Sequence, residues 1–99
     1  MPVIDLDRKP FANADRRAVG IWMGVEGTKP PQFVAVFVRY TTLELAAPSK
    51  PPGIDSVFDT FNQYWPNIVA AANARYQEQL FEDDKYDGQP VIVVRQSDL

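Results

Sequence analysis

Residues 17–25 read RAVGIWMGV, and their larger apolar side chains alternate along the chain. Alternation with a period of two is typical of a β-strand that packs one face against a core. In such a strand, one face would carry Val19, Ile21, Met23 and Val25. The opposite face would be small apart from Trp22, which we interpret as a core residue. The pattern therefore predicts a strand over Arg17–Val25.

A second apolar segment follows after a short break. Residues 32–40 read QFVAVFVRY, a nearly continuous run of β-branched and aromatic side chains, which suits a strand that is buried on both faces or lies centrally in a sheet. The intervening residues include Gly27 and the pair Pro30-Pro31, which favour a turn. The simplest arrangement is a hairpin. Val3–Leu6 are predicted to add a short edge strand.

The segment after the second strand favours helix. In Thr41–Ala47, Thr41 can cap a helix start and Glu44 stands three residues later, as in a capping box. We therefore expect one or two helical turns. The proline-rich residues 48–53 then end the helix and form a stiff connection.

Residues 54–80 have apolar side chains every three or four positions, the spacing of an amphipathic helix. Asp55 or Ser56 can cap its start. Pro66 lies inside this segment, where it lacks an amide proton and its ring crowds the carbonyl of Asn62. A kink or break near Trp65 is expected. Because proline is favoured in the first turn of a helix, the alternative is two helices, with the second beginning at Pro66.

The remaining residues complete an α+β domain. An acidic loop, residues 82–89, precedes a predicted strand over Pro90–Gln96. The elements therefore follow the order β-β-(short α)-α-β. They predict a mostly antiparallel sheet of three or four strands, with one long, kinked or broken helix packed on a single face. A chain of 99 residues is expected to form a single domain, residues 1–99.

Composition excludes many common active sites. The chain contains neither cysteine nor histidine, which removes disulfides, thiolate nucleophiles, the usual zinc sites and imidazole catalysis. Neither a Gly-x-Ser-x-Gly motif nor a phosphate-binding glycine loop occurs. We therefore expect a protein that is not an enzyme and has no cofactor and no metal site.

Charge indicates the kind of partner. The formal net charge is −3, with 10 basic and 13 acidic residues, so a face that neutralises many phosphates is not expected. We predict no direct binding to nucleic acid. Met1–Lys9 mix acids and bases and lack the apolar run of a signal peptide. Apolar runs are far shorter than the roughly 20 residues that cross a bilayer, so we expect no membrane association and a cytoplasmic location.

The last third of the chain resembles a family of short uncharacterised domains found in proteobacteria. The resemblance rests on Phe61-x6-Ile68-x3-Ala72-x3-Tyr76, then on Asp87-Gly88, on Val91–Val94 and on the ending Ser97-Asp98-Leu99. Comparable segments near Arg16 and Thr42 extend it over residues 15–99. Pro66 and the bulky Tyr64-Trp65 pair depart from the family pattern. The resemblance implies a bacterial protein with a hairpin before a C-terminal helix and strand, and implies no catalytic residues.

Two groups of residues are candidates for partner binding. Tyr64 and Trp65 are adjacent, and side chains of adjacent helical residues differ by about 100° in direction, so one of them should be partly exposed. Exposed aromatic residues are enriched in interfaces. The second choice is the acidic run Glu82, Asp83 and Asp84, which lacks the spacing of a calcium loop.

These observations predict a small interaction or regulatory module without catalysis, which acts through a protein partner or through self-association. The alternative is an acidic inhibitor of a basic or nucleic-acid-handling protein, of the kind found in mobile elements, with the acidic run as its contact. A third possibility is a small-molecule enzyme or binder, which would hold a buried carboxylate or tyrosine in a pocket.

Overall fold

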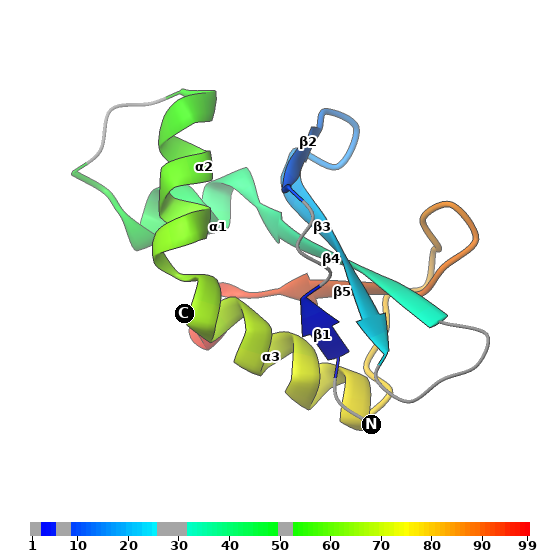
Figure 1. Ribbon diagram of the computed structural model, residues 1–99. Coiled ribbons are helices and arrows are strands. Elements are labelled where there is room, and N and C mark those ends of the chain that lie inside the picture. Colours follow the sequence, from blue (N-terminus) through cyan, green and yellow to red (C-terminus); the bar gives the residue numbers. More distant parts are fainter. Residues whose placement is uncertain (1–2, 6–8, 26–31, 50–52) are drawn as a thin grey trace.

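A computed structural model describes residues 3–5, 9–25, 32–49 and 53–99. The helices are α1 (Tyr40–Ala46), α2 (Ile54–Gln63) and α3 (Trp65–Gln77), and a short 3-10 turn spans Gln96–Asp98. The strands are β1 (Val3–Asp5), β2 (Phe11–Asn13), β3 (Ala18–Val25), β4 (Gln32–Arg39) and β5 (Val91–Val94). In Figure 1, α2 and α3 lie together on one side of the sheet.

The sheet is mixed. Its strand order is β1-β3-β4-β5, and β2 pairs with β3 on the same edge as β1. β1, β2 and β4 run antiparallel to β3, whereas β5 runs parallel to β4. The expectation of a mostly antiparallel sheet is wrong. A parallel pair requires a long crossover, and the three helices between β4 and β5 provide one.

The individual strands lie where the apolar patterns predict them. β3 and β4 form the expected hairpin, with Ala18 opposite Arg39 and Val25 opposite Gln32. The predicted edge strand is β1, and Leu6 lies outside the described residues. The expected turn over residues 26–31 also lies outside them. The pattern gave no indication of β2, which has only three residues.

The helical region contains two separate helices in place of one long helix. α2 ends at Gln63, and α3 begins at Trp65 with Pro66 in its first turn. Tyr64 joins them with φ −96° and ψ 15°, outside helical geometry. The reason is the missing amide proton of Pro66, which is tolerated only where no hydrogen bond to the preceding turn is required. The two-helix alternative was therefore the better description.

The predicted helix caps are wrong. Arg39 and Gly53 occupy the N-cap positions of α1 and α2, and neither helix has a side-chain cap hydrogen bond. Thr41 lies inside α1, and Asp55 and Ser56 lie inside the first turn of α2. Since α1 follows β4 directly, the strand end fixes its start and a capping side chain is not needed.

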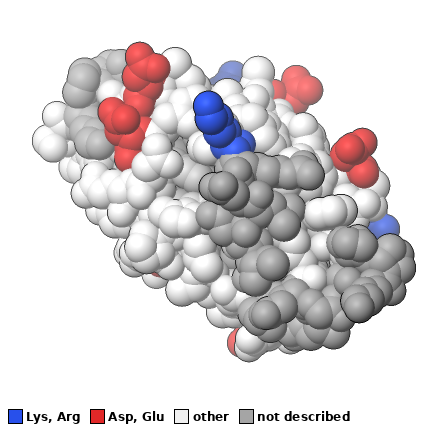
Figure 2. Space-filling view, viewed as in Figure 1, with Lys and Arg blue, Asp and Glu red and all other residues white. Residues whose placement is uncertain are grey.

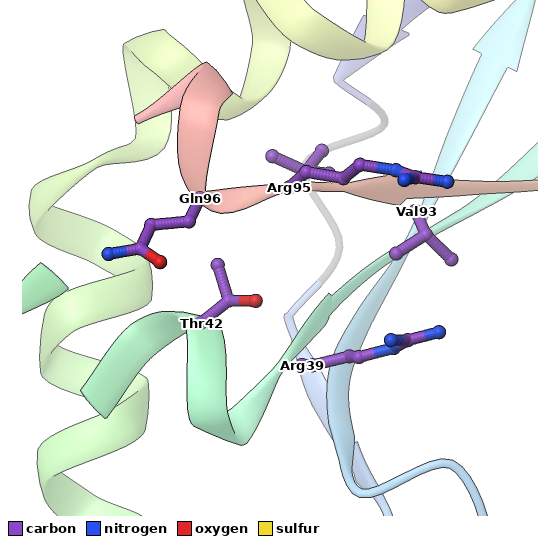
Figure 3. A pocket seen from close by; sticks show the side chains of 6 residues that line it. Arg39, Thr42, Val93, Arg95 and Gln96 are labelled. Atoms are coloured by element: carbon purple, nitrogen blue, oxygen red, sulfur yellow. The ribbon is translucent and has the colours of Figure 1, made fainter. Parts of the chain in front are cut away.

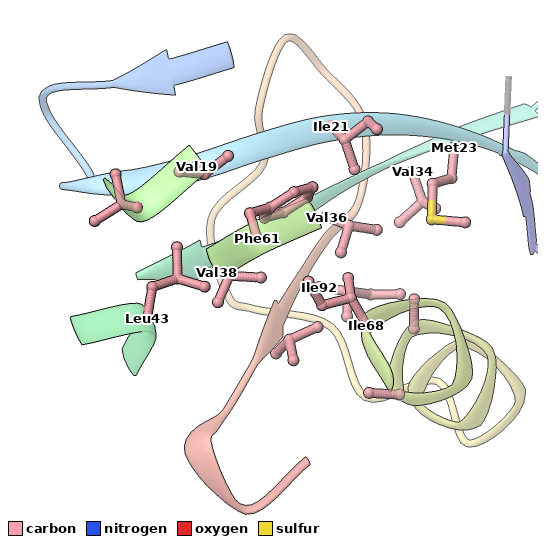
Figure 4. Close-up of a cluster of buried hydrophobic side chains, with 14 of the residues drawn as sticks. Val19, Ile21, Met23, Val34, Val36, Val38, Leu43, Phe61, Ile68 and Ile92 are labelled. Atoms are coloured by element: carbon pink, nitrogen blue, oxygen red, sulfur yellow. The ribbon is translucent and has the colours of Figure 1, made fainter. Parts of the chain in front are cut away.

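The main core lies between the helices and one face of the sheet. Figure 4 shows side chains from β3, β4 and β5 directed toward Leu43 of α1, Phe61 of α2 and Ile68 of α3. The strands contribute the alternate residues Val19, Ile21, Met23, Val34, Val36, Val38, Ile92 and Val94. Phe61 and Ile68 are exposed by only 1% and 0%, so this face of the sheet is fully covered.

The opposite face of the same strands has a different cover, and we call it the open face. Its residues include Ala18, Ala35, Phe37 and Val91, against which Phe11, Trp22, Tyr86 and Val93 pack while still half-buried. None of the described helices contributes to this second cluster. The open face is thus covered by single side chains from β2 and from the loop before β5.

Candidate functional site

Aromatic rings cluster on the open face. Phe37 meets the rings of Phe11 and Tyr86 edge-on, at centroid distances of 6.0 and 5.2 Å. Phe11 and Tyr86 stack at 5.9 Å, and Trp22 lies 5.6 Å from Tyr86. Such ring pairs stabilise the folded state by more than the burial of their apolar area alone. The cluster holds the acidic loop against the sheet through Tyr86.

Gly20 makes room for this cluster. A Cβ atom at Gly20 would lie 2.5 Å from Cε1 of Phe37 and 2.8 Å from Cζ of Phe11. Both distances are shorter than the closest approach of two non-bonded carbon atoms, so a Cβ atom would clash with the rings. The absence of a side chain at this position therefore allows two rings to lie directly on the strand.

Arg16 contacts both the aromatic cluster and the acidic loop. Its guanidinium lies over the Phe37 ring at 4.9 Å and over the Tyr86 ring at 5.8 Å from the centroids. The same group donates a hydrogen bond to Oδ2 of Asp84 at 2.7 Å. The Asp84 side chain is 69% exposed, so the ion pair is a surface contact.

Two further arginines lie side by side at the same end of the open face. Phe37 pairs with Val93 in the parallel β4–β5 register, and Arg39 and Arg95 each follow two residues later. Because side chains two residues apart in a strand share a face, both arginines project from the open face. Figure 3 shows the two side chains extended in the same direction, with Val93 between them.

Within the described ranges, neither Arg39 nor Arg95 forms a close ion pair, and the charge of Arg95 acts on the Asp98 carboxylate without a salt bridge. Their guanidinium groups make no hydrogen bond or ion pair there, and both residues are exposed. They border a hollow of about 230 Å³ together with Thr42, Gln96 and aliphatic residues of β5. Like charges on neighbouring strands are destabilising, so this arrangement is not explained by packing.

The hollow continues toward Arg16. A second hollow, also of about 230 Å³, shares Arg39 and Val93 with the first and is further lined by Arg16, Ala18, Phe37, Glu82 and Asp84. Three arginines therefore follow one end of the open face, and we call Arg16, Arg39 and Arg95 the arginine band. A guanidinium offers a planar fork of donors that matches carboxylates and phosphates. The arrangement can bind an anion.

Asp98 is the carboxyl group with a resolved pKa shift in the described part of the chain. Burial raises the pKa of Asp98, but the hydrogen bond from the Arg95 backbone N–H and the Arg75 guanidinium at 2.7 Å outweigh this effect and hold it below its ordinary value. The positive charge of Arg95 also helps to lower the pKa of Asp98, although the ion pair of this carboxylate is formed with Arg75.

The aromatic site predicted from the sequence lies elsewhere. Tyr64 and Trp65 are both half-buried, at the junction of α2 and α3. The Tyr64 hydroxyl donates to the carbonyl oxygen of Ala46 at 3.2 Å, and the Trp65 ring lies 5.7 Å from that of Phe61. Each side chain therefore has a packing role, and each still keeps an accessible part.

The acidic run lies in the loop between α3 and β5. Glu82 is half-buried, and its N–H donates to the carbonyl oxygen of Val91 at 2.8 Å, beside the start of β5. Asp83 is exposed and Asp84 pairs with Arg16. Figure 1 places this loop far from the α2–α3 junction, so the two predicted groups do not form one site. Among the described residues, acids do not gather in a group of three that could hold a metal ion.

The arginine band was missed by the sequence analysis. Arg39 and Arg95 each follow directly on a buried apolar run, at the ends of QFVAVFV and VIVV. This shared position at the end of an apolar run could have identified the two arginines as candidates for one site. It indicates a shared site only if the two strands are adjacent and parallel, which the sequence did not show.

Comparison with known proteins gives a fold and no function. No family model and no curated protein matches the chain. One similar solved structure is a protein of unknown function from the DUF1488 family of Shewanella loihica, with a TM-score of 0.74 and 16% identity over 95% of this chain and 92% of that one. This neighbour belongs to an uncharacterised domain family, consistent with the resemblance seen in the sequence. At this identity, the likeness shows a common fold alone.

In the view of Figure 2, charged side chains are few and scattered, with acidic groups over the α2 end. None of the helices in the described ranges has the length and apolar character of a bilayer-spanning segment.

Proposed function

We propose that this protein is a non-catalytic interaction module that binds a protein partner through the open face of its sheet. The observation that carries the proposal is the pair Arg39 and Arg95, exposed and without a close ion pair in the described structure, beside half-buried apolar side chains such as Val93 and Trp22. Interfaces commonly combine aromatic and arginine side chains in this way. The open face takes the place of Tyr64 and Trp65 as the favoured contact surface.

Cavity size supports a macromolecular partner. The hollows lined by described residues measure between about 200 and 290 Å³, below the roughly 300–1,000 Å³ typical of sites that enclose a small molecule. A small-molecule enzyme or binder therefore has little support from the geometry. A partner that presents one group to each hollow fits better.

The acidic-inhibitor alternative has weaker support than the open face. Asp84 is already paired with Arg16, so the acidic run offers less free charge than its sequence indicates. Charge reversal at Asp83 tests it, because Asp83 is exposed and does not line the hollows described above. An inhibitor of a basic protein would lose binding, whereas the open-face module would keep its binding.

A pair of single substitutions tests the proposed surface. Val93→Glu places a charge on the open face, and Leu45→Glu places the same charge on an exposed α1 residue as a matched control. We expect nuclease-treated lysate capture by the tagged protein to lose its stoichiometric partner in Val93→Glu only. Circular dichroism would verify that both variants fold.

Two outcomes would contradict the proposal. Partner capture that survives Val93→Glu but is lost in Trp65→Ala would assign the interface to the α2–α3 junction. A bait that captures only itself, with a dimer in sedimentation analysis, would replace the partner by self-association.

A further inference from the structure

We propose that Arg39 and Arg95 form a binding site for a phosphate group carried by a side chain of the partner protein. The inference rests on the proposed function and specifies its chemistry. The juxtaposition that carries it is two exposed arginines that line one hollow, Arg39 at the end of β4 and Arg95 directly after β5. An anion of the phosphate class supplies the charge that the pair lacks.

Charge favours phosphate over carboxylate. A phosphorylated side chain carries about −1.5 to −2 at neutral pH and three acceptor oxygens, whereas a carboxylate carries −1 and two. Two neighbouring guanidinium groups carry two positive charges, so a single phosphate neutralises both. A carboxylate would leave the repulsion between the arginines partly uncompensated.

The lining of the hollow suits the same group. Thr42 lines the hollow and has a hydroxyl that can donate a hydrogen bond to an oxyanion, whereas Figure 3 shows the Gln96 amide directed away from the two guanidinium groups. Val93 supplies an aliphatic contact for the stem of a side chain, while the Val94 side chain lies in the main core. The hollow of about 230 Å³ holds one such group, and it is smaller than the sites that enclose whole nucleotide-sized ligands.

The neighbouring carboxylates form salt bridges with other arginines, and Asp98 interacts with the Arg95 charge only without such a bridge. Asp84 is held by Arg16, and Asp98 is held by Arg75 and by the backbone N–H of Arg95. Glu82 borders the adjoining hollow and does not line the one between Arg39 and Arg95. The overall charge of −3 makes this local excess of positive charge selective for a single anionic group over a long polyanion.

Titration with inorganic phosphate at constant ionic strength tests the site without the partner. The Nε–Hε signals of Arg39 and Arg95 in NMR spectra should move saturably, while the same range of chloride leaves them unmoved. Arg39→Gln or Arg95→Gln should weaken phosphate binding by about tenfold or more, since each removes a charge-assisted hydrogen-bonding group. Lys85→Gln, which removes an exposed charge from the neighbouring loop, should leave binding unchanged.

Other results would overturn the inference. Arginine Nε–Hε signals that do not move with phosphate would rule out the site. Phosphate-induced shifts of neighbouring backbone amides that persist in the Arg39→Gln/Arg95→Gln double variant would also rule it out. Acetate that binds more tightly than phosphate would assign it to an acidic side chain. A single-stranded oligonucleotide that binds more tightly than a phosphoserine-containing peptide library would assign the phosphate to nucleic acid.

The proposed function can fail separately. If phosphate binds as expected but partner capture is insensitive to Val93→Glu, the anion site stands and the open-face interface is wrong. If capture depends on Val93 but phosphate does not bind, the interface stands and its chemistry is different.

Discussion

The two faces of the β3–β4–β5 sheet are built from alternate residues of the same strands, yet they differ in almost every respect. The helix-covered face carries branched aliphatic side chains that are fully buried against α2 and α3. On the open face, Phe37 and Val91 are buried with two alanines, the rings of Phe11, Trp22 and Tyr86 are half-buried, and two arginines are exposed. The difference places the larger aliphatic core on one face and exposed charged groups on the other.

The largest expected effect is on the helix-covered face. Phe61→Ala should lower the free energy of unfolding by about 3–5 kcal/mol, since it leaves a cavity around a ring that is 1% exposed. Trp22→Ala on the open face should cost about 1–2 kcal/mol, because part of the indole already contacts water. Urea denaturation monitored by circular dichroism measures both. Equal losses would mean that the faces contribute alike.

Gly20 gives the next largest effect. Gly20→Ala should cost about 1–3 kcal/mol, because the new methyl group meets the rings of Phe37 and Phe11. Phe11→Ala should free part of this space, so the cost of the double variant should be less than the sum of the single ones. The same denaturation experiment measures it. Strict additivity would show that the rings do not depend on the missing Cβ.

The Arg75–Asp98 pair fixes the chain end beyond β5, and its contribution should depend on pH. Asp98→Asn should cost about 1 kcal/mol at neutral pH, since it weakens charge-assisted hydrogen bonds. The pKa of Asp98 is lowered in the folded state, so its contribution is present above the ordinary value of 3.8 and is lost as pH falls through the folded value.

A pH series of denaturation curves checks this prediction. The stability difference between wild type and Asp98→Asn should be constant from neutral pH to about 5 and should shrink below about pH 4. Asp83→Asn serves as the control, because Asp83 is exposed. A difference that grows with acidity would reverse the assigned sign.

The smallest effect is expected at the exposed ion pair of the open face. Asp84→Asn should change the free energy of unfolding by less than about 1 kcal/mol, and the change should fall with salt. The same variant releases Arg16, so it should tighten phosphate binding to the arginine band. A large loss of stability with no change in phosphate binding would show that Asp84 mainly holds the loop in place.

Sequence reasoning succeeded where a single segment contains the whole signal. The alternation in 17–25 and the apolar run in 32–40 predicted β3 and β4, because burial in a sheet imposes a period of two. Pro66 predicted an interruption because its missing amide proton acts locally. The short strand β2 was not predicted. Its three residues are too few to show a periodic pattern, and the strand forms by pairing with β3.

The candidate site could be predicted from the sequence less well than the strands and helices. Tyr64 and Trp65 were selected for their adjacency, but both have packing partners that lie 18 and 4 residues away, Ala46 and Phe61. Arg16 and Asp84 are 68 residues apart in the chain and meet at 2.7 Å. A charge run such as Glu82–Asp84 therefore cannot be interpreted before its partners are known.

By itself, the sequence determined which residues are apolar, where regular elements begin and break, and which catalytic groups the chain lacks. Those properties follow from local sterics and from side-chain chemistry. Only the tertiary structure decided the direction of β5, the different cover of the two sheet faces, and the meeting of Arg39 with Arg95. These depend on the path of the helical crossover, because strand direction and neighbours are set by the packing of segments far apart in the chain.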